Sequence, residues 1–218
     1  MDLLPLKSDF QSLSNPAKII VFKRFFKTGP GQYGEGDQFL GLTVPQIRSL
    51  SNQYWSKLSL ANLSELLQSP YHEYRTLALV CLCRQFEKFP RRRRQIFDFY
   101  LARTRRINNW DLVDISSPRI VGAYLFEQKD RSILYKLAQS KNLWERRMAI
   151  ISTLYFIKNH QFSDTLSLAK ILLDDPHDLI HKAVGWMLRE VGKRDQKILF
   201  GFLNLYASRL PRTALRYA

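Results

Sequence analysis

Apolar residues recur every three or four positions along most of the chain, which is the spacing of helices that bury one face. No stretch alternates between apolar and polar residues as a half-buried β-strand does. The pattern therefore predicts an all-α fold of about twelve helices. We expect them at residues 16–27, 44–54, 60–68, 71–88, 92–104, 110–124, 131–139, 143–158, 164–173, 178–192 and 196–208, with a last one that begins at residue 211.

Capping residues and prolines agree with these boundaries. Asn15 before Pro16 is typical of an N-cap followed by proline at the first helical position, and Thr43 precedes a similar start. We expect further caps at Ser59, Asp130, Ser163 and Asp195. Prolines fall between the expected helices, at Pro70, Pro90, Pro176 and Pro211.

Neighbouring helices are joined by short connections, so we expect them to pack antiparallel in pairs. About six pairs of roughly 35 residues are typical of an α-solenoid of degenerate, HEAT-like repeats. The expected organisation is a single HEAT-like-repeat domain over residues 1–218 with a concave basic face. The segment that begins at Pro211 is short for a helix, which indicates either an incomplete last pair or a truncated one.

The composition excludes several classes of protein. Apolar residues make up 45% and charged residues 24%, which excludes a disordered chain. The longest apolar run, Leu77 to Cys83, is far shorter than a membrane span. The N-terminus carries Asp2 where a signal peptide has basic residues, and Cys81 and Cys83 are the only cysteines. We therefore expect a cytoplasmic protein, associated with the nucleoid if it binds DNA.

The net charge is +15, and the excess of basic residues is present in both halves of the chain. A basic charge spread through a folded domain favours a polyanionic partner, most often a nucleic acid. The alternative is a basic soluble protein without such a partner.

The segment 28–42 holds five of the nine glycines. It is not a P-loop, because no Gly-Lys-Ser/Thr follows and no strand precedes it. Closely spaced glycines allow backbone amides to face an anion, and Tyr33 lies among them. A flexible loop between two helices is the alternative interpretation.

Two basic clusters flank one expected helix. Arg91, Arg92, Arg93 and Arg94 begin it, and Arg103, Arg105 and Arg106 follow it. They could contact phosphates, or they could be solvated helix ends. His177 and His181 have metal-ligand spacing, but the sequence offers no obvious third ligand, and Cys81 and Cys83 point to different sides of one helix. We expect neither a metal nor a cofactor.

Three tryptophans lie in polar surroundings near charged residues. Trp110 and Asp114 are four positions apart, so the indole and the carboxylate share a helix face. Trp144 and Arg147 share a face in the same way, and Trp186 lies in a later helix. These residues could line one surface. Alternatively, Asp114 pairs with Arg147 structurally and the indoles belong to the core.

At these residues the chain resembles a known family. The phrases NNWDLVD (108–114), KNLWERRMAI (141–150) and DLIHKAVGWMLREVGKRD (178–195), with GPGQYGEGDQFLGL (29–42) upstream, are similar to the DNA alkylation repair proteins of the AlkD-like, HEAT-like-repeat DNA glycosylase superfamily. The resemblance runs from about residue 16 to the end of the chain. It implies an all-α solenoid whose concave face holds duplex DNA. It also implies excision of cationic N3- and N7-alkylpurines without insertion of the base into a pocket.

The resemblance assigns roles to individual residues. The catalytic carboxylate falls on Asp114, the two cleft indoles on Trp110 and Trp186, and the motif arginine on Arg147, with Trp144 as a packing partner. The longer Gly-rich loop 28–42 differs from the best-known members and indicates another subfamily. We expect DNA contacts from one tyrosine and nine basic residues: Tyr33, Arg91, Arg92, Arg103, Arg106, Arg146, Lys182, Arg189, Lys193 and Arg194.

The expected function is hydrolysis of the glycosidic bond in base excision repair, by a monomeric, monofunctional DNA glycosylase. An alkylated purine is already cationic, so its departure needs charge stabilisation rather than a general acid. The alternatives are a non-catalytic solenoid that binds branched or damaged DNA, a protein-interaction scaffold, and an RNA-binding solenoid. A non-catalytic solenoid or scaffold has no use for a carboxylate that faces phosphates. An RNA-binding solenoid predicts aromatic residues that repeat once per helix pair, whereas three tryptophans cluster in residues 110–186 and fit one site better.

Overall fold

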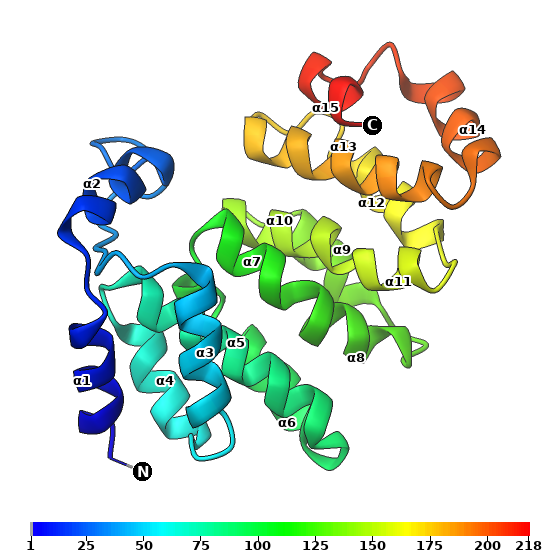
Figure 1. The fold of residues 1–218 in the computed structure, drawn as a ribbon. Coiled ribbons are helices and arrows are strands. Elements are labelled where there is room, and N and C mark those ends of the chain that lie inside the picture. Colours follow the sequence, from blue (N-terminus) through cyan, green and yellow to red (C-terminus); the bar gives the residue numbers. More distant parts are fainter. Residues whose placement is uncertain (1) are drawn as a thin grey trace. The chain divides into compact units, whose positions relative to one another are not determined.

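The computed structural model describes residues 2–218, and all regular structure in that range is helical (Figure 1). Within these residues, the backbones of Gln38 and Tyr71 form an isolated parallel β-bridge. The chain divides into two compact units, Met1–Ser116 and Ser117–Ala218, and each is described by itself. The single domain expected over residues 1–218 stays a prediction.

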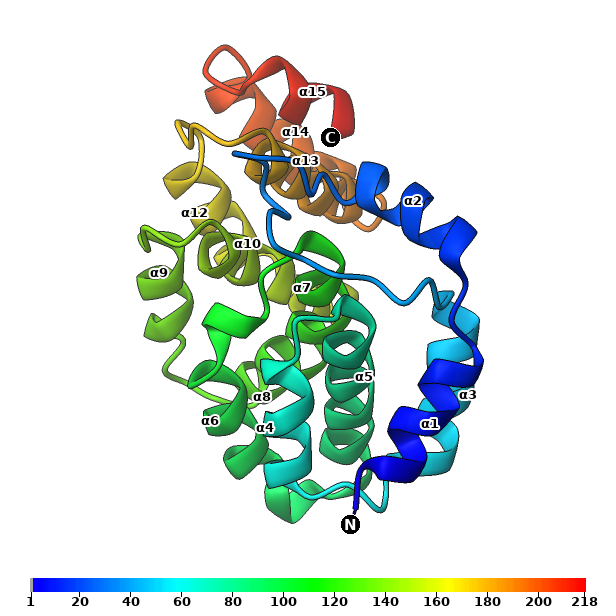
Figure 2. The ribbon, with the colours of Figure 1, turned by 90° about the vertical axis from the view of Figure 1, so that its left-hand side faces the viewer.

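The first unit is assembled around one long helix. α5 (His72–Lys88) is buried along most of its length, because apolar residues such as Leu77 and Leu82 occupy its interior faces. α3 (Val44–Tyr54), α4 (Leu60–Gln68) and α6 (Arg93–Leu101) pack against it. α1 (Leu4–Ser12) lies alongside α3 (Figure 2). The 3-10 turns η1 (Pro90–Arg92) and η2 (Thr104–Arg106) precede and follow α6.

α2 (Pro16–Phe25) is the exception in this unit, because none of its residues is buried. Ile20, Val21 and Phe25 are each more than half exposed. The helix is joined to α3 by the Gly-rich segment, whose Phe39, Leu40 and Leu42 are buried. α2 therefore carries apolar side chains that the first unit does not cover.

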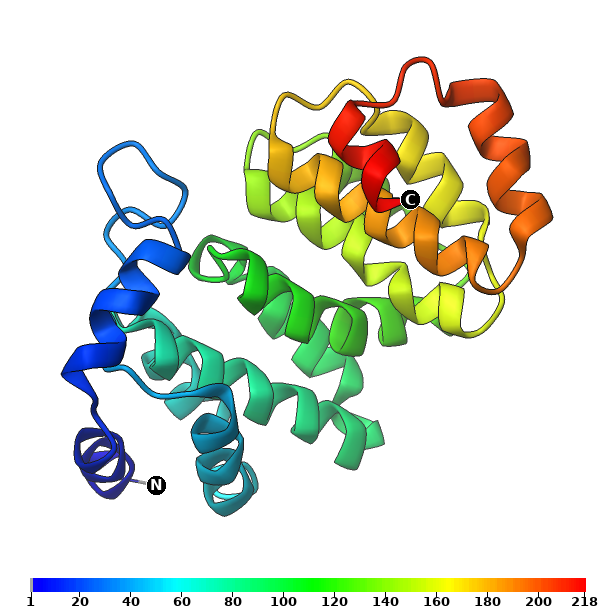
Figure 3. The same ribbon diagram turned by 45° about the horizontal axis from the view of Figure 1, so that its top comes forward.

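The second unit is built on α10 (Leu143–Ser152) and α13 (Asp178–Gly192). α9 (Ser132–Ala138) packs on α10, while α12 (Ser163–Ile171) and α14 (Gln196–Tyr206) pack on α13. α13 lies between α10 and α15 (Arg212–Tyr217), as Figure 3 shows. Gly185 permits this packing, because a Cβ there would collide with the carbonyl oxygen of Ala214.

Most helix starts follow the caps expected from the sequence. The side chains of Asn15, Ser59 and Asp195 accept hydrogen bonds from backbone amides in the first turns of α2, α4 and α14. Thr43 begins α3 with a capping box. The expectation for Ser163 was wrong, because the helix begins at that residue and Phe162 precedes it without a side-chain cap. Asp130 accepts from the amide of Ser132, although Arg131 holds the cap position.

Three features differ from the sequence-based prediction. α1 was not expected, because it is short and buries only Leu6 and Phe10. The helix expected over 110–124 is divided into three successive segments. α7 (Trp110–Ser117) is followed by a π-helical segment, η3 (Pro118–Gly122), and then by α8 (Ala123–Phe126). Pro118 has no N–H for the helical ladder, which explains the wider turn.

The helix expected over 143–158 is also divided, into α10 and α11 (Leu154–Lys158). The hydroxyl of Thr153 donates to the carbonyl of Ile150 at 2.7 Å. A threonine that binds its own helix in this way competes with the backbone ladder and bends the chain. Among residues 2–218, every helix is too short or too polar to span a bilayer.

Candidate functional site

Trp110 and Asp114 lie one turn apart on α7, and both are half-buried. The helix start is fixed by Asn109, whose buried side-chain oxygen accepts from the amide of Trp110 at 2.8 Å. The carbonyl of Asn109 accepts from the amide of Val113 at 3.2 Å. The first turn of α7 therefore places the indole and the carboxylate on one helix face, as the sequence predicted.

The indole of Trp110 belongs to an aromatic cluster. Its ring stacks on Phe26, with centroids 5.7 Å apart and planes 24° apart, and meets the edge of Phe25 at 5.6 Å. Phe26 in turn stacks on Phe39 at 5.3 Å. Since Phe25 and Phe26 come from the end of α2 and Phe39 from the Gly-rich segment, these two elements hold the indole in place.

A buried chain of charged groups ties the start of α7 to α5. The carboxylate of Asp37 accepts from Nη2 of Arg75 at 2.6 Å and lies 3.3 Å from Nδ1 of His72. Nε2 of His72 lies 2.8 Å from Oδ2 of Asp111, in the first turn of α7. Burial alone would lower the pKa of His72, but Asp111 and Asp37 raise it to about 9. The imidazole is therefore a cation at neutral pH that bridges two carboxylates.

Sequence reasoning missed this network. His72 lies outside the three tryptophan motifs, yet it binds Asp111 inside the first of them. No spacing rule connects residues 37, 72, 75 and 111. The available signal was chemical: Arg75 and His72 stand in a helix whose other residues are mostly apolar, and buried charges of this kind need partners.

The Gly-rich segment does present backbone amides to an anion, but the anion is a carboxylate of the same chain. The buried side chain of Glu73 accepts from the amides of Leu40, Gly41 and Leu42 at 2.8 to 3.3 Å. Gly31, Gly36 and Gly41 have positive φ angles. The end of this segment is thus bound to α5.

The residues expected to bind DNA in the first unit fall into two groups. Arg91 and Arg92 lie in η1, where Arg91 is exposed and the guanidinium of Arg92 lies 5.8 Å from the ring centre of Phe89. Tyr33 is half-buried, and its hydroxyl donates to the carbonyl of Phe25 at 3.4 Å.

Arg103 and Arg106 are engaged within the fold. Nε of Arg103 donates to the hydroxyl of Ser64 at 3.1 Å, and its guanidinium lies 3.8 Å from the ring centre of Phe99. Arg106 donates to three backbone carbonyls at the end of α4, those of residues 67, 68 and 69. Both side chains donate hydrogen bonds within the fold, and Arg103 also covers an aromatic ring. These contacts are sufficient to explain their positions.

The second unit holds Arg147, Trp144 and Trp186. Arg147 is buried in α10, and its Nη1 donates to the carbonyl of Leu179 at 2.6 Å. Trp144 is buried one turn earlier, consistent with a packing role. Trp186 is half-buried on α13.

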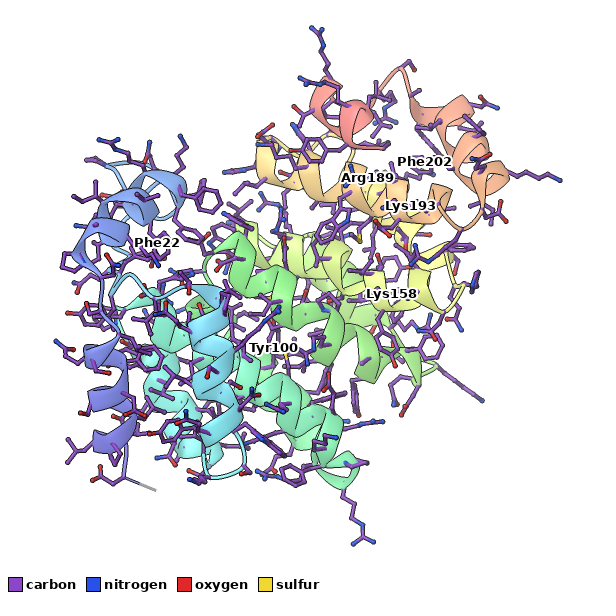
Figure 4. All side chains as sticks on the ribbon, viewed as in Figure 1. Phe22, Tyr100, Lys158, Arg189, Lys193 and Phe202 are labelled. Atoms are coloured by element: carbon purple, nitrogen blue, oxygen red, sulfur yellow. The ribbon has the colours of Figure 1, made fainter. Side chains whose placement is uncertain are left out.

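The other basic residues expected to bind DNA in the second unit differ in their contacts. Arg146 is paired with Asp175 at 2.6 Å and is mostly buried. Lys182 pairs with Asp178, while Lys193 and Arg194 share Glu190. Arg189 is exposed and lies 5.9 Å from the ring centre of Tyr217. Arg189 projects from α13, and Lys193 projects from the position directly after the end of that helix (Figure 4).

The histidines with metal-ligand spacing have other partners. Nδ1 of His177 caps α13 by accepting from the amide of Leu179 at 3.1 Å, and Nε2 of His181 bonds the carbonyl of Asp175. No group of three or more potential metal ligands occurs within residues 2–218. Cys81 and Cys83 are buried thiols.

Comparison with known proteins gives a family and a fold. The model of the family described as DNA alkylation repair enzyme matches residues 6–218. A solved structure, described as a predicted DNA alkylation repair enzyme from Enterococcus faecalis, aligns with a TM-score of 0.71 over 94% of each chain at 18% identity. No curated protein matches the sequence. The all-α, HEAT-like fold expected from the sequence is thereby confirmed.

Proposed function

Since this chain belongs to the DNA alkylation repair enzyme family, we propose that it is a DNA glycosylase that binds duplex DNA and hydrolyses the glycosidic bond of purines alkylated at N3 or N7. The observation that carries the proposal is the placement of Asp114 and Trp110 one turn apart on α7.

The chemistry of the lesion explains why one carboxylate suffices. A purine alkylated at N3 or N7 carries a positive charge, so the bond to the sugar breaks without a proton donor. Positive charge then develops on the sugar. A fixed carboxylate such as Asp114 in a partly dehydrated site stabilises that charge by about 3–4 kcal/mol. The face of the Trp110 indole adds roughly 0.5–2 kcal/mol of cation–π attraction.

The aromatic and ionic contacts of α7 support the proposal. Electrostatic catalysis requires groups that are already oriented, because reorientation during the reaction costs the energy that the charge would supply. Trp110 is held by Phe25 and Phe26, and the adjacent Asp111 is held by His72. The first turn of α7 is therefore fixed on two sides before any substrate binds.

Within the proposal, the exposed basic residues are the better candidates for phosphate contacts. Arg91, Arg189 and Lys193 are exposed. Arg103, Arg106 and Arg146 satisfy partners within the fold, and we assign them a supporting role. Trp186 keeps the substrate-contacting role that the family resemblance implies. Arg147 keeps its implied role as well, although it is buried and its Nη1 donates to the carbonyl of Leu179. We propose no metal and no cofactor.

A comparison of lesions tests the reaction class. Duplexes carrying 7-methylguanine, 3-methyladenine, uracil or 8-oxoguanine are incubated with one preparation of the protein, and released base is quantified. We expect release of the two cationic purines and none of the neutral bases, because no acid is assigned to protonate a neutral leaving group. Comparable release of uracil would contradict the mechanism. The absence of release from all four duplexes would contradict the assigned activity.

A further inference from the structure

The first unit contains a pocket of about 340 Å³ next to Trp110. Its walls are mainly apolar and come from α2, the Gly-rich segment and α3, with Phe22, Phe26, Phe39 and Ile47 among the lining residues. Phe22 projects from α2 (Figure 4). The volume lies at the lower end of the range of small-ligand sites, roughly 300–1,000 Å³.

The aromatic rings suit a flat ligand. Phe26 and Phe39 are nearly parallel, with planes 17° apart, and Phe22 meets both rings edge-on at 6.2 and 6.0 Å. Two side chains of the lining, Phe25 and Val44, are more than half exposed. Phe26 and Phe39 are stacked on each other and almost fully buried, so a planar ring that enters beside Phe25 and Val44 would exchange water for the exposed ring of Phe25 and for the edges of the buried rings.

The pocket also has charged lining residues: His72 and Glu73 from α5, and Asp111 from α7. Oδ2 of Asp111 bonds Nε2 of His72, whose other ring nitrogen is directed to Asp37. Oδ1 of Asp111 is buried and has no hydrogen-bond partner within residues 2–218. A buried carboxylate oxygen without a donor is unfavourable, and it would be satisfied by a ligand that brings an N–H group.

We propose that this pocket binds an unpaired nucleobase of DNA, with an exocyclic amino group donating to Oδ1 of Asp111. That the base belongs to DNA rests on the proposed function. That the ligand is a planar ring with an N–H donor follows from the lining of the pocket. The carboxylate is distinct from Asp114, and His72 holds its other oxygen. The captured base is therefore not the alkylated purine on which Asp114 acts, whose excision needs no insertion into a pocket. The pocket would capture a base that has already left the stack, because unstacking is the cost such sites must offset.

The test uses four fluorescently labelled DNAs of one sequence: a fully paired duplex and duplexes with a single bulged adenosine, a bulged deoxynebularine or a bulged abasic residue. Deoxynebularine is adenosine without its amino group. We expect the bulged adenosine to bind about tenfold tighter than deoxynebularine, as a hydrogen bond to a charged group allows. The abasic bulge should bind no more tightly than the paired duplex.

Two tryptophan substitutions locate the effect. Val44→Trp adds bulk at the pocket, and Ile20→Trp makes the same change at an exposed residue of α2 that does not line it. We expect Val44→Trp to abolish the preference for the bulged adenosine, and Ile20→Trp to leave it unchanged. In Asp111→Asn the difference between adenosine and deoxynebularine should disappear, because the amide oxygen is needed by the protonated His72 and the amide NH2, which is a donor, is left to face the pocket.

The possible outcomes distinguish failure of the proposed base-binding pocket from failure of the proposed glycosylase activity. Equal binding of adenosine and deoxynebularine, or a preference that survives Val44→Trp, would overturn the base-binding pocket. Tight binding of paired duplex with no preference for a bulged base would overturn the pocket alone. A preference for bulged adenosine together with no release of alkylpurines would overturn the glycosylase and leave the pocket. Failure to bind any of the DNAs would overturn both.

Discussion

His72 is a buried cation placed between two carboxylates, and it connects the Gly-rich segment, α5 and α7 through side chains alone. Asp37 and Asp111 each face one of its ring nitrogens. Arg75 forms an ion pair with Asp37, so that two cations balance the two carboxylates. Removing one member of such a group leaves the others charged and buried, which is costly. Asp111 follows Trp110 directly in α7, so this ionic group and the aromatic cluster hold neighbouring residues of one helical turn.

The free energy of unfolding should fall as the pH rises past neutrality. In the folded protein the pKa of His72 is raised from 6.5 to about 9. The stabilisation is therefore fully present below about pH 6.5 and is lost as the pH rises through 9, by an amount on the order of 3 kcal/mol. Urea unfolding between pH 6 and pH 9.5 measures this change.

Two variants serve as controls for the pH effect. His72→Gln should be less stable at pH 6 and should lose the pH dependence. His160→Asn changes an exposed histidine whose φ of 57° asparagine tolerates, and it should behave as the wild type. A wild-type stability that does not change from pH 6 to pH 9.5 would show that His72 is not the bridging cation.

Among the elements, the Gly-rich segment shows how a loop fixes the helix beside it. Gly36 and Gly41 have nearly the same φ, +84° and +86°. A Cβ on Gly41 would collide with the carbonyl oxygen of Asn15, the N-cap of α2, whereas a Cβ on Gly36 would meet nothing within 4 Å. Only Gly41 is therefore needed both for its backbone angle and for close packing.

Alanine at these two glycines should give different results. Gly36→Ala should cost about 1 kcal/mol, since only the backbone angle is unfavourable. Gly41→Ala should cost about 3 kcal/mol or more, because the start of α2 must also move. The free energies of unfolding of the two variants, from urea denaturation, measure the difference. Equal losses would mean that the contact between residues 15 and 41 does not constrain α2.

The sequence predicted most of the helices, but not the side-chain contacts that join them. Apolar periodicity and caps such as Asn15 and Ser59 were sufficient for most helices, because both are local. The placement of Trp110 and Asp114 one turn apart on one helix was predictable for the same reason. The bond between His72 and Asp111 was not, because it joins positions far apart in sequence through side chains that carry no spacing signal. The division of the helix at Thr153 depends on a single hydroxyl and was missed.

For the whole molecule, we expect the net charge of +15 to govern the affinity for DNA. If about six phosphates are contacted, the affinity for duplex DNA should fall roughly 10³-fold between 50 and 200 mM salt. Replacing an exposed residue such as Arg189 or Lys193 by alanine should remove about one phosphate contact. The slope of log affinity against log salt concentration should then fall by about one, for any DNA sequence. Titrations of a labelled duplex at several salt concentrations measure both effects. An affinity that does not change with salt would mean that the charge has another role.

The most direct test of the account is release of 7-methylguanine from a methylated duplex by Asp114→Asn. The control is Asp98→Asn, which changes an exposed carboxylate on α6 that pairs with Arg94 at 2.8 Å. We predict that Asp114→Asn lowers the rate at least about 100-fold, with duplex binding retained or tighter because a negative charge is removed, while Asp98→Asn stays at the wild-type rate. A folded Asp114→Asn variant that releases the base as fast as the wild type would contradict the account.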